Sequence, residues 1–119
     1  MTTQNDSLEK QLAKSSELNI TVTGRKSGRT ISLPIWFVWE DGTLYLLPVK
    51  GSDTQWYKNI LKNSTMRIEA GGAEADLKVA AVTEPKQVSS VIEKFRAKYA
   101  GDVKKYYSKF DVAVLAQTR

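Results

Sequence analysis

Alternation of apolar and polar side chains is the dominant pattern along this chain. In residues 18–23, Leu, Ile and Val alternate with Asn and Thr, which is the period-two pattern of a half-buried strand. Five further apolar runs are separated by short segments that contain Gly, Asp or Pro, the residues of tight turns. The predicted strands cover residues 18–23, 31–39, 43–49, 66–70, 75–82 and 111–116.

The run 31–39 carries three large aromatic side chains. Pro34 has no N–H to donate, so it marks a strand edge or a bulge. Alternation places Trp36 on one face of the strand and Phe37 and Trp39 on the other, so at least one ring needs a cover. A partner subunit, a substrate or an N-terminal helix would provide that cover. We expect a partner subunit, and hence a homodimer.

Two segments have the apolar stripe of an amphipathic helix outside the glycine loops described below. The longer helix is predicted to begin at Pro85 and to end at Gly101. A thinner stripe predicts a short helix over residues 6–16 with Asp6 as its N-cap. Residues 104–109 form a short basic and aromatic connector that would also suit a helix.

The turns between the strands are short, which favours antiparallel pairing. The Asp41-Gly42 pair is a strong hairpin signal of this kind. Six strands with two or three helices in the connections predict an α+β domain built on a small barrel, whose closure would hide the strand edges. We expect residues 1–119 to form a single domain, with residues 1–17 as an N-terminal helix packed on it.

Composition narrows the chemistry. The chain has 119 residues, of which 41% are hydrophobic and 26% charged, as in an ordinary globular protein. It contains no Cys and no His, which excludes disulfides, thiolate metal sites, the Ser-His-Asp triad and nearly every zinc site. An enzyme with this composition would rely on a bound cofactor for its chemistry.

Charge and hydropathy indicate the partners. The net charge of +5 favours anionic ligands, and phosphate-bearing cofactors would suffice. No apolar run approaches the roughly 20 residues of a membrane span. We therefore expect a cytoplasmic protein with a small-molecule substrate.

The segment Thr-Gly-Arg-Lys-Ser-Gly-Arg at residues 23–29, here called the basic loop, is the first candidate site. Glycine lets a ligand approach the backbone, and the cations favour an anion such as phosphate. The alternative is a hairpin turn whose cations keep a strand end soluble. The candidate residues are Arg25, Lys26, Ser27, Gly28 and Arg29.

A second glycine loop, residues 50–53, is here called the Lys50 loop. It runs into a helix predicted over residues 54–63, with Ser52 or Asp53 as the N-cap. A helix N-terminus preceded by Lys50 and Gly51 is a second candidate anion site. If the strands between the two loops form a hairpin, both loops lie at the same end of the domain.

Trp56 and Tyr57, at the start of this helix, would flank a planar ring, and Asn59 would bind a polar edge. The alternative is that Trp56 belongs to the core and Asn59 faces solvent. Residues 94–109 carry six cations among aromatic side chains, a composition that also suits single-stranded nucleic acid. Several of those aromatics belong to the core stripe of the long helix, so we do not expect nucleic acid as the partner.

These motifs occur in a recognisable order over residues 18–63. The basic loop, Pro34, the Asp41-Gly42 hairpin, Lys50-Gly51 and the Trp-Tyr-Lys-Asn-Ile run at 56–60 resemble the deazaflavin-dependent nitroreductase and quinone-reductase family. That family belongs to the FMN-binding split β-barrel superfamily. The resemblance implies an α+β split β-barrel of six to seven mostly antiparallel strands with two to three flanking helices.

The resemblance also implies a function. It implies an oxidoreductase that uses coenzyme F-420, or alternatively FMN, to deliver hydride to a quinone, nitro or unsaturated compound. The basic loop would hold the phosphate or acidic tail, and backbone N–H groups of the Lys50 loop would stabilise charge on the ring. The implied cofactor-binding residues are Arg25, Lys26, Ser27, Gly28, Lys50, Gly51, Trp56, Tyr57 and Asn59.

The chain departs from the family pattern at several positions. Ile31 stands where the family has a second Arg, and Arg29 would have to replace that contact. Tyr99 matches the first of the family's C-terminal tyrosines, and the second and third, which face substrate, are lost unless Tyr106 substitutes. The candidate substrate residues are therefore Tyr99 and Tyr106. Two alternatives stay open: a non-catalytic flavin-, haem- or ligand-binding module on the same barrel, and a basic domain associated with nucleic acid.

Overall fold

The computed structural model describes the backbone of residues 4–118 and the side chains of residues 8–118. In chain order, the elements are α1 (Gln4–Leu12), β1 (Leu18–Thr23), β2 (Thr30–Ile35), β3 (Val38–Glu40), β4 (Thr43–Leu46), the 3-10 turn η1 (Gly51–Asp53), α2 (Gln55–Lys62), β5 (Thr65–Ala70), β6 (Ala73–Val82), α3 (Pro85–Tyr99), α4 (Asp102–Tyr106) and β7 (Ala113–Gln117). Each of these helices is too short or too polar to span a membrane.

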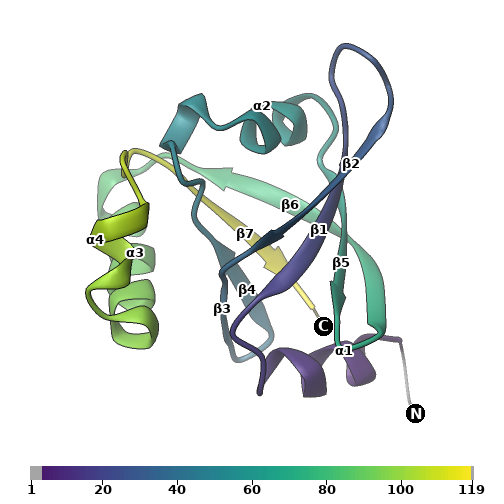
Figure 1. The fold of residues 1–119 in the computed structure, drawn as a ribbon, viewed down its shortest axis with the longest axis horizontal. Helices are drawn as coiled ribbons and strands as arrows, with labels where there is room; N and C mark the ends of the chain where they lie inside the picture. The colour runs from purple at the N-terminus through teal and green to yellow at the C-terminus, as the bar shows by residue number, and fades with distance from the viewer. Residues whose placement is uncertain (1–3, 119) are drawn as a thin grey trace.

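The strands form one curled sheet in the order β2-β1-β5-β6-β7-β4-β3, with every neighbouring pair antiparallel. Figure 1 shows that the sheet curls into a half-barrel, which is open between the two edge strands β2 and β3. The predicted α+β split-barrel fold is confirmed. The described part of the chain has seven strands and four α-helices, one helix more than the two or three predicted. The connector expected over residues 104–109 is partly helical, as α4.

Two apolar cores hold the sheet in this shape. The first fills the barrel and includes Leu8 and Leu12 of α1, which lies against β5 and β6. The second lies between the sheet and the helices α3 and α4, where Phe95 is fully buried. Burial of a side chain of this size contributes about 1.5–3 kcal/mol.

The strand predicted over residues 31–39 is divided into β2 and β3 by a bend at Trp36 and Phe37. Pro34 lies in β2, and β2 is an edge strand, so the predicted edge position is confirmed. Alternation survives the bend, because Phe37 packs in the barrel core and Trp36 against the second core. The hairpin predicted at Asp41-Gly42 is also confirmed and joins β3 to β4.

The N-terminal helix differs from its prediction. The backbone is helical from Gln4, so the predicted N-cap at Asp6 is wrong, and α1 ends at Leu12 before the predicted end at residue 16. Residues 1–3 and 119 lie outside the described residues. The prediction of a single domain over residues 1–119, with residues 1–17 packed on it, stays a prediction.

The helix α3 begins as predicted at Pro85, and the Glu84 carboxylate caps it by accepting hydrogen bonds from two N–H groups of its first turn. Its C-terminus differs from the prediction. The helix ends at Tyr99 with Ala100 as its C-cap at φ 55°, and Gly101 has a helical conformation as the N-cap of α4.

The second glycine loop also differs in detail. The helix α2 has Thr54 as its N-cap, so the predicted caps Ser52 and Asp53 are wrong. Both of those residues lie in the 3-10 turn η1. The Thr54 hydroxyl accepts a hydrogen bond from the Lys50 N–H at 2.8 Å.

Candidate functional site

The basic loop and the Lys50 loop lie at the same end of the barrel. Figure 1 shows the loop between β1 and β2, the turn η1 and the helix α2 together at this end. The strands β2 and β3 lead away from it, and β4 returns to it after the Asp41-Gly42 hairpin. The two predicted anion sites are therefore neighbours of the same helix, as the sequence suggested.

The basic loop is closed by its own hydrogen bonds. The Gly24 N–H donates to Arg29 O at 2.7 Å, and the Gly28 N–H donates to Gly24 O at 2.9 Å. The Arg29 N–H donates to the Ser27 hydroxyl at 3.2 Å. Gly28 has φ +73°, which only glycine adopts easily, and the space beside it is open. Three of the seven N–H groups of residues 23–29 thus hold the shape of the loop.

Arg25 fastens the basic loop to α2. Its backbone N–H and its Nη1 both donate to Asn59 Oδ1, at 3.1 and 2.8 Å, and its Nη2 donates to Gln55 Oε1 at 2.9 Å. Asn59 is 3% exposed, and Lys62 Nζ reaches Arg25 O at 3.2 Å. The structure therefore brings the predicted residues Arg25 and Asn59 together, with the Asn59 carbonyl occupied by the arginine.

The cations of the basic loop have no carboxylate partner. Within the described side chains, no ion pair involves Arg25, Lys26 or Arg29, and the two acceptors that hold Arg25 are neutral amides. Lys26 and Arg29 are exposed. Three positive charges within five residues, none paired with a described carboxylate, create a positive potential that attracts anions.

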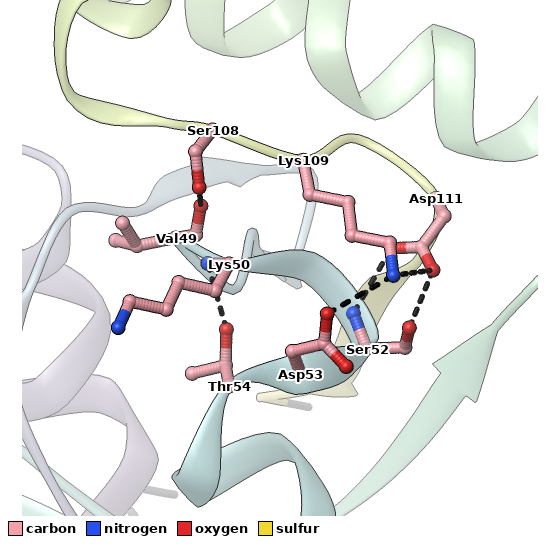
Figure 2. Close-up of polar contacts among 8 residues, drawn as sticks. All are labelled: Val49, Lys50, Ser52, Asp53, Thr54, Ser108, Lys109 and Asp111. Carbon is pink, nitrogen blue, oxygen red and sulfur yellow. Dashed lines mark hydrogen bonds and ion pairs between the residues drawn. The ribbon is translucent and has the colours of Figure 1, made fainter.

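The Lys50 loop behaves differently, because its N–H groups are engaged within the chain. Asp111, which precedes β7, accepts hydrogen bonds from the Ser52 N–H at 2.9 Å and the Ser52 hydroxyl at 2.5 Å (Figure 2). The other donors of this segment are Lys50 N–H to Thr54 Oγ1, Gly51 N–H to Pro48 O, Asp53 N–H to Lys50 O and Thr54 N–H to Gly51 O. No N–H of residues 50–54 is left over for a ligand.

Acidic side chains also balance the charge beside this loop. Lys109 Nζ lies 3.1 Å from Asp53 and 3.7 Å from Asp111 (Figure 2). Burial alone would raise the pKa of Asp111, but the hydrogen bonds from Ser52 and the charge of Lys109 outweigh it and lower that pKa. Lys50 extends away from this group of charges, and no described side chain forms an ion pair with it.

Gly51 is required by packing against the chain itself. It has φ +55°, and a Cβ at this position would collide with the Asp111 carboxylate and press on the Lys109 side chain. From the sequence, Lys50 and Gly51 were expected to form an anion site before a helix N-terminus. In the structure, Lys109 and Asp111 of the segment before β7 lie against Gly51.

A largely apolar groove of about 560 Å³ lies between the end of β2, the Lys50 loop, the start of α2 and α4. Its apolar walls include Pro34, Trp36, Leu47, Val49, Trp56 and Tyr106. The polar residues that line it include Lys50, Gln55 and the carboxylates Glu17 and Asp53. Of the predicted site residues, the groove thus collects Lys50, Trp56 and Tyr106. A groove of this size with aromatic walls suits a planar ring.

The two tyrosines predicted to face substrate have different environments. Tyr106 is 55% exposed and lines the groove, with its ring edge-on to Trp36 at 5.6 Å. Tyr99 stacks on the other side of the site against Trp36 at 4.4 Å, and its hydroxyl bonds to the backbone of Phe37 and Ser16. Burial raises the pKa of Tyr99 to about 12. Tyr99 therefore packs against Trp36, and its hydroxyl is already engaged by the backbone.

The Trp-Tyr-Lys-Asn segment of α2 faces three directions. Trp56 is 4% exposed, packs in the barrel core and also lines the groove, while Tyr57 packs in the same core and does not line the groove. Burial, and secondly the charge of Asp111, raise the pKa of Tyr57. Asn59 faces the basic loop. The helix thus connects core, groove and basic loop.

Gln55 is a site residue that the sequence analysis did not select. It lines the groove and also accepts the hydrogen bond from Arg25, so it joins the groove to the basic loop. Its place as the first residue of α2, next to Trp56, was the only available signal.

A wider hollow of about 750 Å³ lies on the outer face of β1, β2, β5 and β6. Its polar groups largely satisfy one another: Thr21 and Ser32 share a hydrogen bond of 2.7 Å, and Arg67 pairs with Asp76 at 2.9 Å. The described residues of the chain form no cluster of metal-binding side chains. We therefore regard the smaller apolar groove as the candidate site.

Comparison with known families gives one match to the sequence. The family model described as "Uncharacterized protein conserved in bacteria (DUF2255)" matches residues 8–118. No curated protein matches the sequence.

Several solved structures share the fold. A structure of an F-420-H2-dependent reductase (FDR-A) is 19% identical, with a TM-score of 0.67 over 86% of this chain and 94% of that one. The haem storage protein HutZ from Vibrio cholerae is 13% identical, with a TM-score of 0.68 over 98% and 90% of the two chains. A protein solved as a domain-swapped dimer is 17% identical, with a TM-score of 0.68 over 97% and 100%. At these identities, the likeness shows the fold alone.

Proposed function

This chain belongs to the DUF2255 family of uncharacterized proteins conserved in bacteria, and on that premise we propose that it binds a flavin-type cofactor. The ring would lie in the apolar groove, and the phosphate or acidic tail would lie at the basic loop. Coenzyme F-420 is the first candidate and FMN the second. The fold neighbours that are named as F-420-dependent reductases support the deazaflavin.

One observation carries this proposal. An aromatic groove and three cations without carboxylate partners lie at the same end of the barrel, joined by the first turn of α2. A ligand that is planar at one end and anionic at the other matches both features. A purely apolar ligand would leave the cations unexplained, and a free anion would leave the groove unexplained.

The residues of the groove fit such a ring. Trp36, Trp56 and Tyr106 provide aromatic lining, and Lys50 adds a positive charge beside the carboxylates Glu17 and Asp53. Gln55 lines the groove and accepts a hydrogen bond from Arg25. In the basic loop, Lys26 and Arg29 would bind the phosphate, and Arg25, held by Asn59, would fix the position of the loop.

We propose that the chain acts as an oxidoreductase on a small acceptor such as a quinone, a nitro compound or an unsaturated ring. The cofactor supplies the hydride when it is bound in its reduced form. The chain orients the ring, excludes water along the apolar walls and offers the exposed face of Tyr106 to the acceptor. Val49, 40% exposed beside Tyr106 in the groove wall, and the domain-swapped neighbour support a homodimer, which a mass measurement in solution tests.

The direct test is a titration of the purified protein with coenzyme F-420 and with FMN, followed by fluorescence. We expect a dissociation constant below about 100 μM for at least one of them. Binding of neither ligand in this range would contradict the proposed function.

A second candidate function is a non-catalytic binding module. The hydroxyl of Tyr99 and every N–H of residues 50–54 are engaged within the chain, which leaves few groups to assist a reaction. The test is the rate at which menadione oxidises the reduced cofactor with and without the protein. An unchanged rate despite binding would favour the module, and a parallel titration with haemin tests the haem alternative, which the neighbour HutZ suggests.

A further inference from the structure

Gln55 occupies a junction that the proposed function does not yet use. Its carboxamide oxygen accepts a hydrogen bond from Arg25 Nη2 at 2.9 Å, and the residue lines the groove. Guanidinium nitrogens only donate hydrogen bonds, so the atom of Gln55 that faces Arg25 must be the oxygen. The amide nitrogen Nε2, with its two N–H donors, is then free to pair with a ligand, on a residue that is solvent-exposed.

The orientation of this amide is fixed by a chain of contacts. Asn59 is 3% exposed and holds Arg25 through both the backbone N–H and Nη1. Arg25 in turn holds the oxygen of Gln55. A flip of the Gln55 amide would set its N–H groups against those of the guanidinium and would lose a charge-assisted hydrogen bond. Within the described side chains, no hydrogen bond uses Gln55 Nε2.

We propose that Gln55 determines which ring the groove accepts, by donating a hydrogen bond from Nε2 to an acceptor atom on the edge of the ring. The ligand class is a planar heteroaromatic ring with carbonyl oxygens on one edge. This inference rests on the proposed function and adds a specificity to it. A tricyclic ring of similar size without a carbonyl edge would fill the groove and leave the donor unpaired.

The alternative is that Gln55 only fastens the basic loop to α2. The substitution Gln55→Glu separates the two roles. Glutamate keeps an oxygen for Arg25, so the loop stays fastened, but it replaces the N–H donor with an acceptor. The same substitution at Gln87 in the first turn of α3 is a matched control away from the groove.

The experiment measures the affinity of two uncharged probes for each variant. Riboflavin has the carbonyl edge and lacks the phosphate, so the basic loop does not contribute. Phenazine is a tricyclic ring without carbonyl groups. Binding of riboflavin is followed by its own fluorescence and binding of phenazine by quenching of tryptophan fluorescence, and thermal melting shows that each variant is folded.

We expect Gln55→Glu to raise the dissociation constant of riboflavin by roughly tenfold or more, because an acceptor then faces an acceptor. The dissociation constant of phenazine should change by less than about twofold. Gln87→Glu should change neither of the two dissociation constants.

Equal changes for both probes, or no change for riboflavin, would overturn the role of Gln55 and leave the proposed function intact. A wild-type protein that binds phenazine but none of riboflavin, FMN and coenzyme F-420 would overturn both, because the ring with an acceptor edge would then not be a ligand.

Discussion

The basic loop and the Lys50 loop look alike in sequence and differ in chemistry. Both contain glycine and lysine, both adjoin α2, and both lie at one end of the barrel. In the basic loop, Arg25 donates to two neutral amides, and none of the loop's cations forms an ion pair with a described side chain. Beside the Lys50 loop, Asp53 and Asp111 surround Lys109, and Asp111 takes the Ser52 N–H.

The difference shows what turns a glycine-containing cationic loop into an anion site. The N–H groups and positive charges of such a loop attract whichever carboxylate is within reach, and a side chain of the same protein has the advantage of being always present. Asp111 lies 59 residues from Ser52 in sequence. On the proposed function, the basic loop is therefore the one that would take an external anion.

The largest expected effect is that of Gly51→Ala on stability. A Cβ at φ +55° is strained and would also displace the Asp111 carboxylate, so we expect a loss of about 2–4 kcal/mol in the free energy of unfolding. Urea denaturation provides the measurement. Gly28→Ala is the control, because Gly28 has a similar φ but open space around it, and we expect a loss of only about 1 kcal/mol. Equal losses would mean that Asp111 does not occupy the Lys50 loop.

The second expected effect concerns ligand affinity. The double variant Lys26→Ala/Arg29→Ala should weaken the binding of FMN by about 1–2 kcal/mol, since exposed charge-assisted contacts are partly screened by water. It should leave the affinity for riboflavin unchanged, because that ligand lacks the phosphate. Lys109→Ala is the matched control, because Lys109 is already paired with Asp53. If Lys109→Ala weakened FMN binding as much as the double variant, the proposed difference in anion binding between the two loops would be contradicted.

The smallest expected effect is the pH dependence of Asp111→Asn. Because the pKa of Asp111 is lowered in the folded state, its charge stabilises the fold above the ordinary aspartate pKa of about 3.9. This contribution is lost as the pH falls through the lower pKa of the folded state. Because the side chain is 38% exposed, we expect less than about 1 kcal/mol at neutral pH. Thermal melting of the wild type and Asp111→Asn from pH 7 to pH 2 gives the difference. A difference that persists at pH 2 would show that the charge is not its source.

Much of the fold was predictable because its signals are local. The alternation in Leu18–Thr23 and the Asp41-Gly42 turn each specify a strand or a hairpin within a few residues, and the structure confirms both. The common end of the two glycine loops followed from that hairpin. Pro34 indicated a strand edge or a bulge, because a missing N–H is tolerated at both, and the structure has it in the edge strand β2.

The rest depended on contacts between distant residues. Nothing near Ser52 in sequence indicates that Asp111 will take its N–H, and nothing near Gly101 indicates that Ala100 will adopt the positive φ. Tyr99 was expected to face substrate, but its hydroxyl reaches the backbone of Phe37 instead. Gln55 has no composition signal, because its position between Arg25 and the groove exists only in the folded chain.

The most direct test of the central claim compares FMN and riboflavin on the wild-type protein at low and at high salt. The two ligands share the ring and differ in the phosphate, so their difference in affinity isolates the basic loop. The account predicts that FMN binds more tightly than riboflavin at 20 mM salt and that the two affinities converge toward 1 M salt, where the Debye length falls to about 3 Å. Equal affinities at both salt concentrations would contradict it.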